Sequence, residues 1–279
     1  FCAGACPLGA LQDAVAFRPI ELPKWLQKVL GLIPYLYLAL AVLYAATRSE
    51  FLICRYDPFI GIFRFDAHFE MLLLGGLFLL VGVFVARPYC RFFCPYGVLL
   101  GWMSTFSNKH MTITPKECIQ CKLCANSCPY GAIDEPAEEQ GNRRSNVQRL
   151  MAYLLFIPLW MGIGGLAGSM VSPQLAKFNK TVYLAEQLLE HPEIRQDQNN
   201  IDARIFMQSG KTMDQLVTEA QAIRSQFYWG GWILGGFMGL VVGLTLVKLS
   251  SHRNKNDYEP DKTNCLSCGR CMDYCPVKK

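Results

Sequence analysis

Several common functional motifs are missing from this sequence of 279 residues. It has no CxxCH sequence, which attaches c-type haem, and no GxxxxGK[ST] loop, which binds nucleotide phosphates. Residues 162–167 fit the GxGxxA pattern of dinucleotide-binding folds, but they lie inside an apolar run that no strand precedes. These absences exclude a c-type cytochrome, a P-loop nucleotidase and a Rossmann-type dehydrogenase.

Charged residues are scarce as well. They make up 18% of the chain, against 52% hydrophobic residues, so a purely soluble protein is not expected. Four uncharged runs are long enough, or nearly long enough, to cross a bilayer, which takes about 20 mainly apolar residues. These runs are residues 29–47, 71–86, 150–176 and 225–247. We therefore predict an all-α membrane protein with about four transmembrane helices.

The distribution of Lys and Arg predicts the orientation of these spans. A fifth apolar run, 92–108, holds a Cys-Pro pair, and we expect it to be re-entrant or interfacial. With four spans, 18 of the 27 Lys and Arg residues fall on the side that carries both chain ends. Basic residues are retained in the cytoplasm. We therefore place that side, with every cysteine except Cys54, in the cytoplasm, as part of a multi-pass membrane protein.

The 13 cysteines are too many and too regularly spaced for chance. Disulfide frameworks belong to small secreted domains, so metal ligation is the better interpretation. Two segments, ECIQCKLCANSCPYGAI (117–133) and NCLSCGRCMDYCPVKK (264–279), repeat the CxxCxxCxxxCP spacing of bacterial ferredoxins. A structural zinc site, usually two separate CxxC pairs or a Cys/His mixture, fits this spacing poorly.

In two-cluster ferredoxins the first three cysteines of each run hold one [4Fe–4S] cluster, and the fourth ligates the other cluster. We therefore predict two [4Fe–4S] clusters with exchanged fourth ligands. The cluster-1 set is Cys118, Cys121, Cys124 and Cys275, and the cluster-2 set is Cys265, Cys268, Cys271 and Cys128.

Between Cys128 and Cys265, the nearest cysteines of the two runs, lie 136 residues that contain two predicted spans, and an even number of crossings returns the chain to the same face. The predicted organisation has four parts. They are a membrane region with two spans (1–108), the first ferredoxin half (109–148), a transmembrane hairpin (149–248) with an external helical loop (177–224), and the second ferredoxin half (249–279).

Two features of the hairpin predict its packing. Glycines recur every four residues at Gly231, Gly235, Gly239 and Gly243, and the preceding span has Gly164 and Gly168. Small residues at this spacing let membrane helices approach closely, so we expect the two spans to pack face to face. TMDQ (212–215) has the sequence of a capping box, which predicts that the last helix starts there.

A second repeat is the CxxxCP motif, found in FCAGACPLGAL (1–11) and YCRFFCPYGVL (89–99). In each motif two cysteines four residues apart can project from one face of a helical turn. We expect the CxxxCP quartet, Cys2, Cys6, Cys90 and Cys94, either to close around a third metal centre or to act as two dithiols. Repetition of the whole motif argues against four merely buried thiols.

These motifs together resemble the NapH/NosR-type membrane polyferredoxins of nitrate and nitrous-oxide respiration. FCAGACPLGALQD and RPYCRFFCPYGVLLG are most similar to the NosR-like branch, and the likeness covers roughly residues 1–133 and the last dozen. The resemblance implies an electron-transfer component of a respiratory chain in denitrification, rather than a stand-alone enzyme. NosR-like proteins also carry a flavin-binding domain before this region. The absence of an initial methionine suggests a fragment, so we expect FMN on a preceding segment.

The partners implied are the lipid bilayer and a redox protein, which would be a periplasmic reductase, its maturation factor or a cytochrome. The apolar stretch 54–70, which holds six Arg, Asp, His and Glu residues, is either a plain interfacial turn, the commoner case, or a contact for a quinone or flavin donor. We expect no nucleic acid. Two other functions stay open: a metal-handling or maturation factor, such as a membrane cupric reductase, and a redox-sensing regulator. External segments rich in His or Met would favour the copper alternative, and the sequence has few of them.

Overall fold

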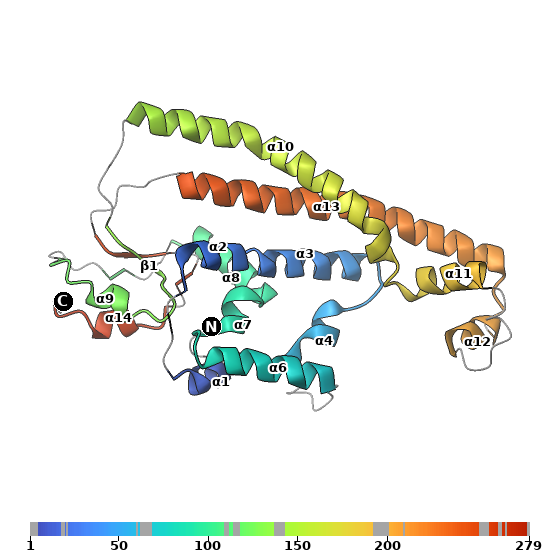
Figure 1. Ribbon diagram of the computed structural model, residues 1–279, viewed down its shortest axis with the longest axis horizontal. Helices are drawn as coiled ribbons and strands as arrows, with labels where there is room; N and C mark the ends of the chain where they lie inside the picture. The colour runs from blue at the N-terminus through green and yellow to red at the C-terminus, as the bar shows by residue number, and fades with distance from the viewer. Residues whose placement is uncertain are drawn as a thin grey trace. The chain divides into compact units, whose positions relative to one another are not determined.

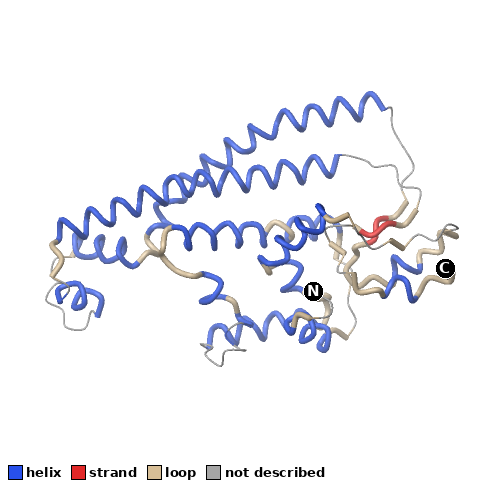
Figure 2. Tube along the Cα trace, turned by 180° about the vertical axis from the view of Figure 1, so that it is seen from behind, coloured by secondary structure: helices blue, strands red, loops and turns tan. Residues whose placement is uncertain are grey.

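The computed structural model describes most of the chain, and every structural statement below concerns only this part. The described residues are 5–17, 20, 22–59, 61, 69–108, 112–113, 118–136, 143–191, 201–208, 210–250, 257–261, 264–265 and 267–277. Their secondary structure is helical apart from two short strands, β1 (Ile133–Asp134) and β2 (Glu259–Pro260) (Figures 1 and 2). With the apolar spans described below, this confirms an all-α membrane protein.

The chain divides into two units. The first comprises Phe1–Leu38, Cys54–Ala152 and Leu246–Lys279, and the second comprises Ala39–Ile53 and Tyr153–Thr245. The first unit therefore contains both CxxxCP motifs and both ferredoxin halves. The second unit contains most of the hairpin that separates those halves in the sequence.

Short helices build the first unit. They are α1 (Pro7–Val15), α2 (Lys24–Leu30), the first turns of α3 (Ile33–Ala46), the end of α4 (Leu52–Tyr56), α6 (Phe69–Gly82), α7 (Pro88–Phe92), α8 (Pro95–Phe106), α9 (Leu123–Asn126) and α14 (Arg270–Asp273). The repeated Cys-Pro pair has the same structural role twice. Cys6 and Cys94 are the N-cap residues of α1 and α8, each with extended backbone angles, and proline follows at the first helical position, where its missing N–H costs nothing.

Among the described residues, three helical segments are long and apolar enough to cross a membrane: Trp25–Ala46, Tyr153–Ala176 and Met213–Lys248. The predicted span at 71–86 is observed as α6, whose 14 residues cover only ~21 Å of a hydrocarbon core of about 30 Å. The helix ends at Gly82 and the chain then turns. Ala86 is buried against Tyr130 and Ala132 of the first ferredoxin half. A fourth crossing therefore stays a prediction. So does the re-entrant course of 92–108, where α8 has 12 residues.

In the second unit, α10 (Arg143–Ala176) and α13 (Met213–Ser250) run side by side in both views (Figures 1 and 2). A Cβ atom added to Gly164 or Gly235 would collide with the backbone carbonyl of the other, and the same holds for Gly168 with Gly231. The predicted glycine-mediated packing is thus confirmed. These glycines let the two backbones touch, which maximises van der Waals contact where lipid offers no hydrophobic driving force.

The loop of the hairpin folds over its end with two amphipathic helices, α11 (Lys180–Glu190) and α12 (Ile201–Gln208). Their apolar residues join a buried cluster with Leu216 and Ala220 of α13. The predicted capping box is present. The N–H of Thr212 donates to Oε1 of Gln215 over 3.1 Å, and the N–H of Gln215 donates to Oγ1 of Thr212 over 3.4 Å. Helix α13 accordingly begins at Met213.

Candidate iron–sulfur sites

The two ferredoxin halves meet in space. Strands β1 and β2 pair antiparallel, with Ile133 opposite Pro260 and Asp134 opposite Glu259. The N–H of Asp261 donates to the carbonyl of Ala132 over 2.8 Å, and α9 packs against α14. Segments more than a hundred residues apart in the sequence therefore form one module within the first unit.

Both cysteine runs wind in the same way. The second and fourth residues after the first cysteine have left-handed backbone angles: φ is 50° at Gln120 and 61° at Lys122 in the first run, and 54° at Ser267 and 84° at Gly269 in the second. Three of these four residues carry a Cβ atom, which makes the conformation costly and rarely adopted without a functional constraint. Such turns point successive backbone N–H groups to one side and create a concave surface suited to an anion.

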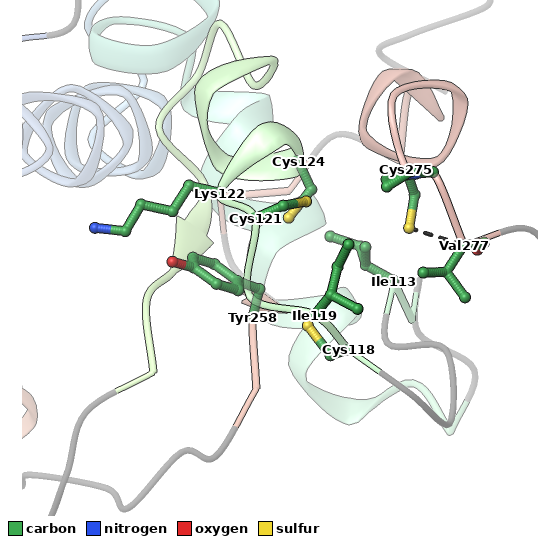
Figure 3. Close-up of a pocket in the computed structure, with 10 residues that line it drawn as sticks. Ile113, Cys118, Ile119, Cys121, Lys122, Cys124, Tyr258, Cys275 and Val277 are labelled. Atoms are coloured by element: carbon green, nitrogen blue, oxygen red, sulfur yellow. Dashed lines mark hydrogen bonds between the residues drawn. The ribbon is translucent and has the colours of Figure 1, made fainter.

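The first hollow lies between the two halves (Figure 3). It is bordered by Cys118, Cys121 and Cys124 of one segment and by Cys275 of the C-terminal segment, and it encloses about 380 Å³ of space, part of which is open to solvent. Its remaining lining is largely apolar, with Ile113, Tyr258 and Val277 among its residues, whereas the side chain of Lys122 points away. The structure thus brings together the four residues of the cluster-1 set.

The second hollow has the complementary composition. Its lining includes Cys265, Cys268 and Cys271 together with Cys128 from the other half, and it encloses about 360 Å³. Tyr130, Ala132 and Ile133 complete one side. The structure thus brings together the four residues of the cluster-2 set, and Cys128 and Cys275 each face the hollow of the opposite run.

The donor sets fit polynuclear clusters. None of the described cysteines forms a disulfide, and within the described part of the chain no group of three or more Cys, His, Asp or Glu residues is close enough to hold a single metal ion. Four thiols spread around a hollow suit a cluster whose four irons each take one thiolate. The role of these eight residues as ligands stays a prediction.

The thiol groups themselves need positive charge close by in order to ionise. Burial raises the pKa of Cys124, and burial followed by the charges of Cys265, Cys128 and Cys268 raises the pKa of Cys271 to about 11. Four thiolates cannot ionise side by side without a compensating positive charge. Iron ions would supply that charge and displace the thiol protons.

The CxxxCP motifs also come together in the first unit. Cys90 lies in α7, and burial raises the pKa of its thiol to about 12, with the nearby thiols of Cys94 and Cys6 acting in the same direction. Gln12 of α1 donates from Nε2 to Sγ of Cys90 over 3.2 Å. Cys2 lies outside the described residues. The structure therefore gathers the three described members of the CxxxCP quartet, and it leaves both a third centre and two dithiols as predictions.

The candidate donor contact at 54–70 is described only in part, since residues 60 and 62–68 lie outside the described chain. Cys54 is exposed at one end of it. Asp57 is buried, its carboxylate accepts a hydrogen bond from the hydroxyl of Tyr89, and the N–H of Phe59 donates to it over 3.0 Å. This polar contact ties the stretch to the second CxxxCP motif.

Sequence reasoning missed a group of polar residues around the second motif. Arg87 is 2% exposed and forms an ion pair with Asp13 that raises the pKa of its guanidinium. Arg91 donates to the carbonyl of Tyr130 over 2.8 Å and to Oε1 of Gln27 over 3.1 Å. The available signal was the pair of arginines that flank Cys90 in an otherwise apolar segment.

Comparison with known proteins agrees with this site. The chain matches one family of 4Fe–4S binding domains at residues 1–32, 67–114 and 124–148, and a second at residues 111–134. It is 29% identical to YccM of Escherichia coli, whose name assigns it to electron transport, over 145 residues that make up 46% of this chain and 41% of YccM.

Two further relatives are similar over a slightly larger share of the chain. NirI of Paracoccus denitrificans is 30% identical over 146 residues, 48% of this chain and 21% of NirI. The regulatory protein NosR of Stutzerimonas stutzeri is 28% identical over 147 residues, 48% of this chain and 20% of NosR. The chain is thus similar, over part of its length, to 4Fe–4S binding domains and to proteins of the NirI, NosR and YccM type. No solved structure matches it.

The matched part of these relatives is limited. The alignment with this chain covers from about a fifth to two fifths of their own length. The family models describe the CxxxCP region and the first cysteine run, and neither of the two matches includes residues 265–275. The pairing of the second run with the first therefore rests on the geometry of the two hollows.

Proposed function

We propose that this chain is a polyferredoxin, an electron-transfer component of a bacterial cytoplasmic membrane that relays electrons to a periplasmic reductase or to its maturation system. The observation that carries the proposal is that Cys275 lines the hollow of the first cysteine run and Cys128 lines the hollow of the second, as an exchange of fourth ligands requires. An exchange of this kind brings two one-electron sites together in one small module. A chain of closely spaced sites is what an electron relay requires.

The chain's own residues would do three things in this relay. The cluster-1 and cluster-2 sets would each hold one [4Fe–4S] cluster, which stores and releases an electron when bound. The apolar lining of the hollows, including Ile113 and Tyr258, would exclude water from the thiolates. The CxxxCP quartet, whose Cys6 and Cys94 cap membrane-region helices, would exchange electrons with a quinone or flavin donor.

The test is the metal content of the full chain. Protein purified without air in detergent should contain about eight irons and about eight acid-labile sulfides per chain, or about twelve of each if the CxxxCP quartet holds a third cluster. Electron paramagnetic resonance of the dithionite-reduced protein should then show two interacting [4Fe–4S] signals. Zinc in place of iron would overturn the proposal.

A redox-sensing regulator is the second candidate, because NosR is named as a regulatory protein. Both functions need the same clusters but differ in turnover. A relay in membrane vesicles passes electrons continuously from a reduced quinol pool to an acceptor outside, whereas a sensor is reduced once and stops. Measuring cluster reoxidation under steady quinol supply separates the two.

A further inference from the structure

The second hollow adjoins the second CxxxCP motif. Ala86, which is followed by Arg87, Pro88, Tyr89 and Cys90, packs in one buried cluster with Tyr130 and Ala132, and Cys128 and Cys265 of the second hollow pack against it. The described lining of the first hollow contains no residue of either motif. Of the two cluster sites, the cluster-2 site is therefore the one in contact with the membrane-region helices of the first unit.

Tyr130 is the residue that makes this contact, and two arginines hold it. The guanidinium of Arg87 lies 5.7 Å from the centre of the Tyr130 ring, and Nη2 of Arg91 donates to the Tyr130 carbonyl over 2.8 Å. The next residue, Gly131, has a φ of +56° and lies beside the side-chain amide of Gln27. A left-handed glycine at this point turns the Tyr130 carbonyl towards Arg91, two residues after the ligand candidate Cys128.

The two arginines differ in how their charge is balanced. Arg87 is neutralised by the carboxylate of Asp13, to which it donates twice. Arg91 instead donates to two neutral oxygens, Oε1 of Gln27 and the carbonyl of Tyr130. Burial lowers the pKa of Arg91, and the nearby charge of Cys128 opposes that effect. Arg91 thus places a poorly solvated positive charge beside the cluster-2 site, without a carboxylate partner in the part of the chain that the structure describes.

We propose that Arg91 is a positioning residue that fixes the cluster-2 site against the second CxxxCP motif and raises the reduction potential of that site. The proposal rests on the proposed function, since it assumes that a [4Fe–4S] cluster is bound there. Reduction adds one electron and therefore one negative charge to the site. A half-buried cation nearby stabilises the more negative state, as charge and hydrogen bonding around a cluster set its potential. The cluster-2 site is then the point at which electrons pass between the CxxxCP quartet and the ferredoxin module.

The test is a redox titration of the full chain in detergent, with dithionite as reductant and electron paramagnetic resonance as the readout. Arg91→Gln should make reduction of one of the two clusters about tenfold less favourable, a fall of about 59 mV for a one-electron couple. Arg91→Lys keeps the charge and loses the planar fork, so the potential should stay close to that of the unmodified protein. Cys268→Ser, which alters one ligand of the cluster-2 set, identifies the signal that must move.

Two further variants make the test robust. Gln27→Glu puts a carboxylate next to Arg91 without removing it, so the same cluster should become harder to reduce even if Arg91→Gln fails to assemble. Lys122→Gln removes an exposed charge at the first hollow and should leave the potential of the cluster-2 site unchanged, because solvent screens that charge.

The outcomes separate the two proposals. If the unmodified protein assembles no iron–sulfur clusters, the proposed function itself fails. If two clusters assemble, any of three results overturns the role of Arg91. In the first, Arg91→Gln and Gln27→Glu both leave the reduction potential of the cluster-2 site unchanged. In the second, the potentials of both clusters shift equally, and in the third, Arg91→Lys lowers the potential as much as Arg91→Gln does.

Discussion

The side chain of Gln12 connects the two CxxxCP motifs, since its Nε2 atom donates a hydrogen bond to Sγ of Cys90 over 3.2 Å. Gln12 has no exposed surface. Its Oε1 atom accepts a hydrogen bond from the N–H of Tyr89 over 3.2 Å, and Nε2 also donates to the carbonyl of Leu8 over 3.1 Å. One buried amide therefore satisfies polar groups on both α1 and α7.

Replacing Gln12 should destabilise the first unit. Gln12→Ala leaves the Tyr89 N–H without its partner in a buried position, which costs about 1–3 kcal/mol. Thermal unfolding in detergent, followed by circular dichroism, should show a lower midpoint than for Gln208→Ala, which removes an exposed glutamine amide from α12. Equal midpoints for the two variants would mean that Gln12 does not hold the motifs together.

The glycine contact between α10 and α13 gives a second prediction, with a control glycine in α10 that lies outside the contact. Gly235→Ala places a methyl group against the backbone of Gly164 and should cost about 1–3 kcal/mol through overpacking. Gly162→Ala meets nothing within 4 Å and should leave stability nearly unchanged. Thermal unfolding of both variants in detergent decides the matter, and a destabilised Gly162→Ala with an unaffected Gly235→Ala would contradict this packing.

The membrane topology is a third prediction. With four crossings, the described positions Glu135 and Asp257 are cytoplasmic and Lys211 is external. Alkaline phosphatase fused after Lys211 should be active, because the enzyme folds only outside the cytoplasm, and fusions after Glu135 or Asp257 should be inactive. Activity after Glu135 would show that α6, at 14 residues, does not cross.

What the sequence could predict was set by local periodicity. The spacing of Gly164, Gly168, Gly231 and Gly235 fixes one helix face whatever the rest of the chain does, so the packing of α10 on α13 followed from it. The capping box at Thr212 and Gln215 is likewise complete within four residues. The fold class followed from the length of the apolar runs.

What it could not predict depends on contacts between distant segments. Arg91 and Tyr130 are 39 residues apart, and Gln12 and Cys90 are 78 apart, with no periodic pattern that links them. Strands β1 and β2 have two residues each, too short for any alternation to show. The eight ferredoxin cysteines could be found by spacing alone, but the charged surroundings of each site could not.

The exchange of fourth ligands is the sharpest prediction. Cys275 follows Cys271 by four residues, yet it borders the first hollow with Cys118, Cys121 and Cys124. Cys275→Ala should therefore disturb the cluster bound by the first run and leave the cluster bound by its own neighbours intact. Iron should fall from about eight towards about four per chain if the three-thiolate cluster is lost.

Electron paramagnetic resonance can assign the loss. Cys121→Ser marks the signal of the cluster-1 set and Cys268→Ser marks that of the cluster-2 set, because an oxygen ligand alters the spectrum of the cluster that carries it. Cys54→Ala, at an exposed cysteine outside both runs, serves as the control and should keep both signals. If Cys275→Ala removes the signal marked by Cys268→Ser instead, each run holds its own cluster. The pairing of β1 with β2 would then join two independent sites, and the hollows would no longer explain why the two halves meet.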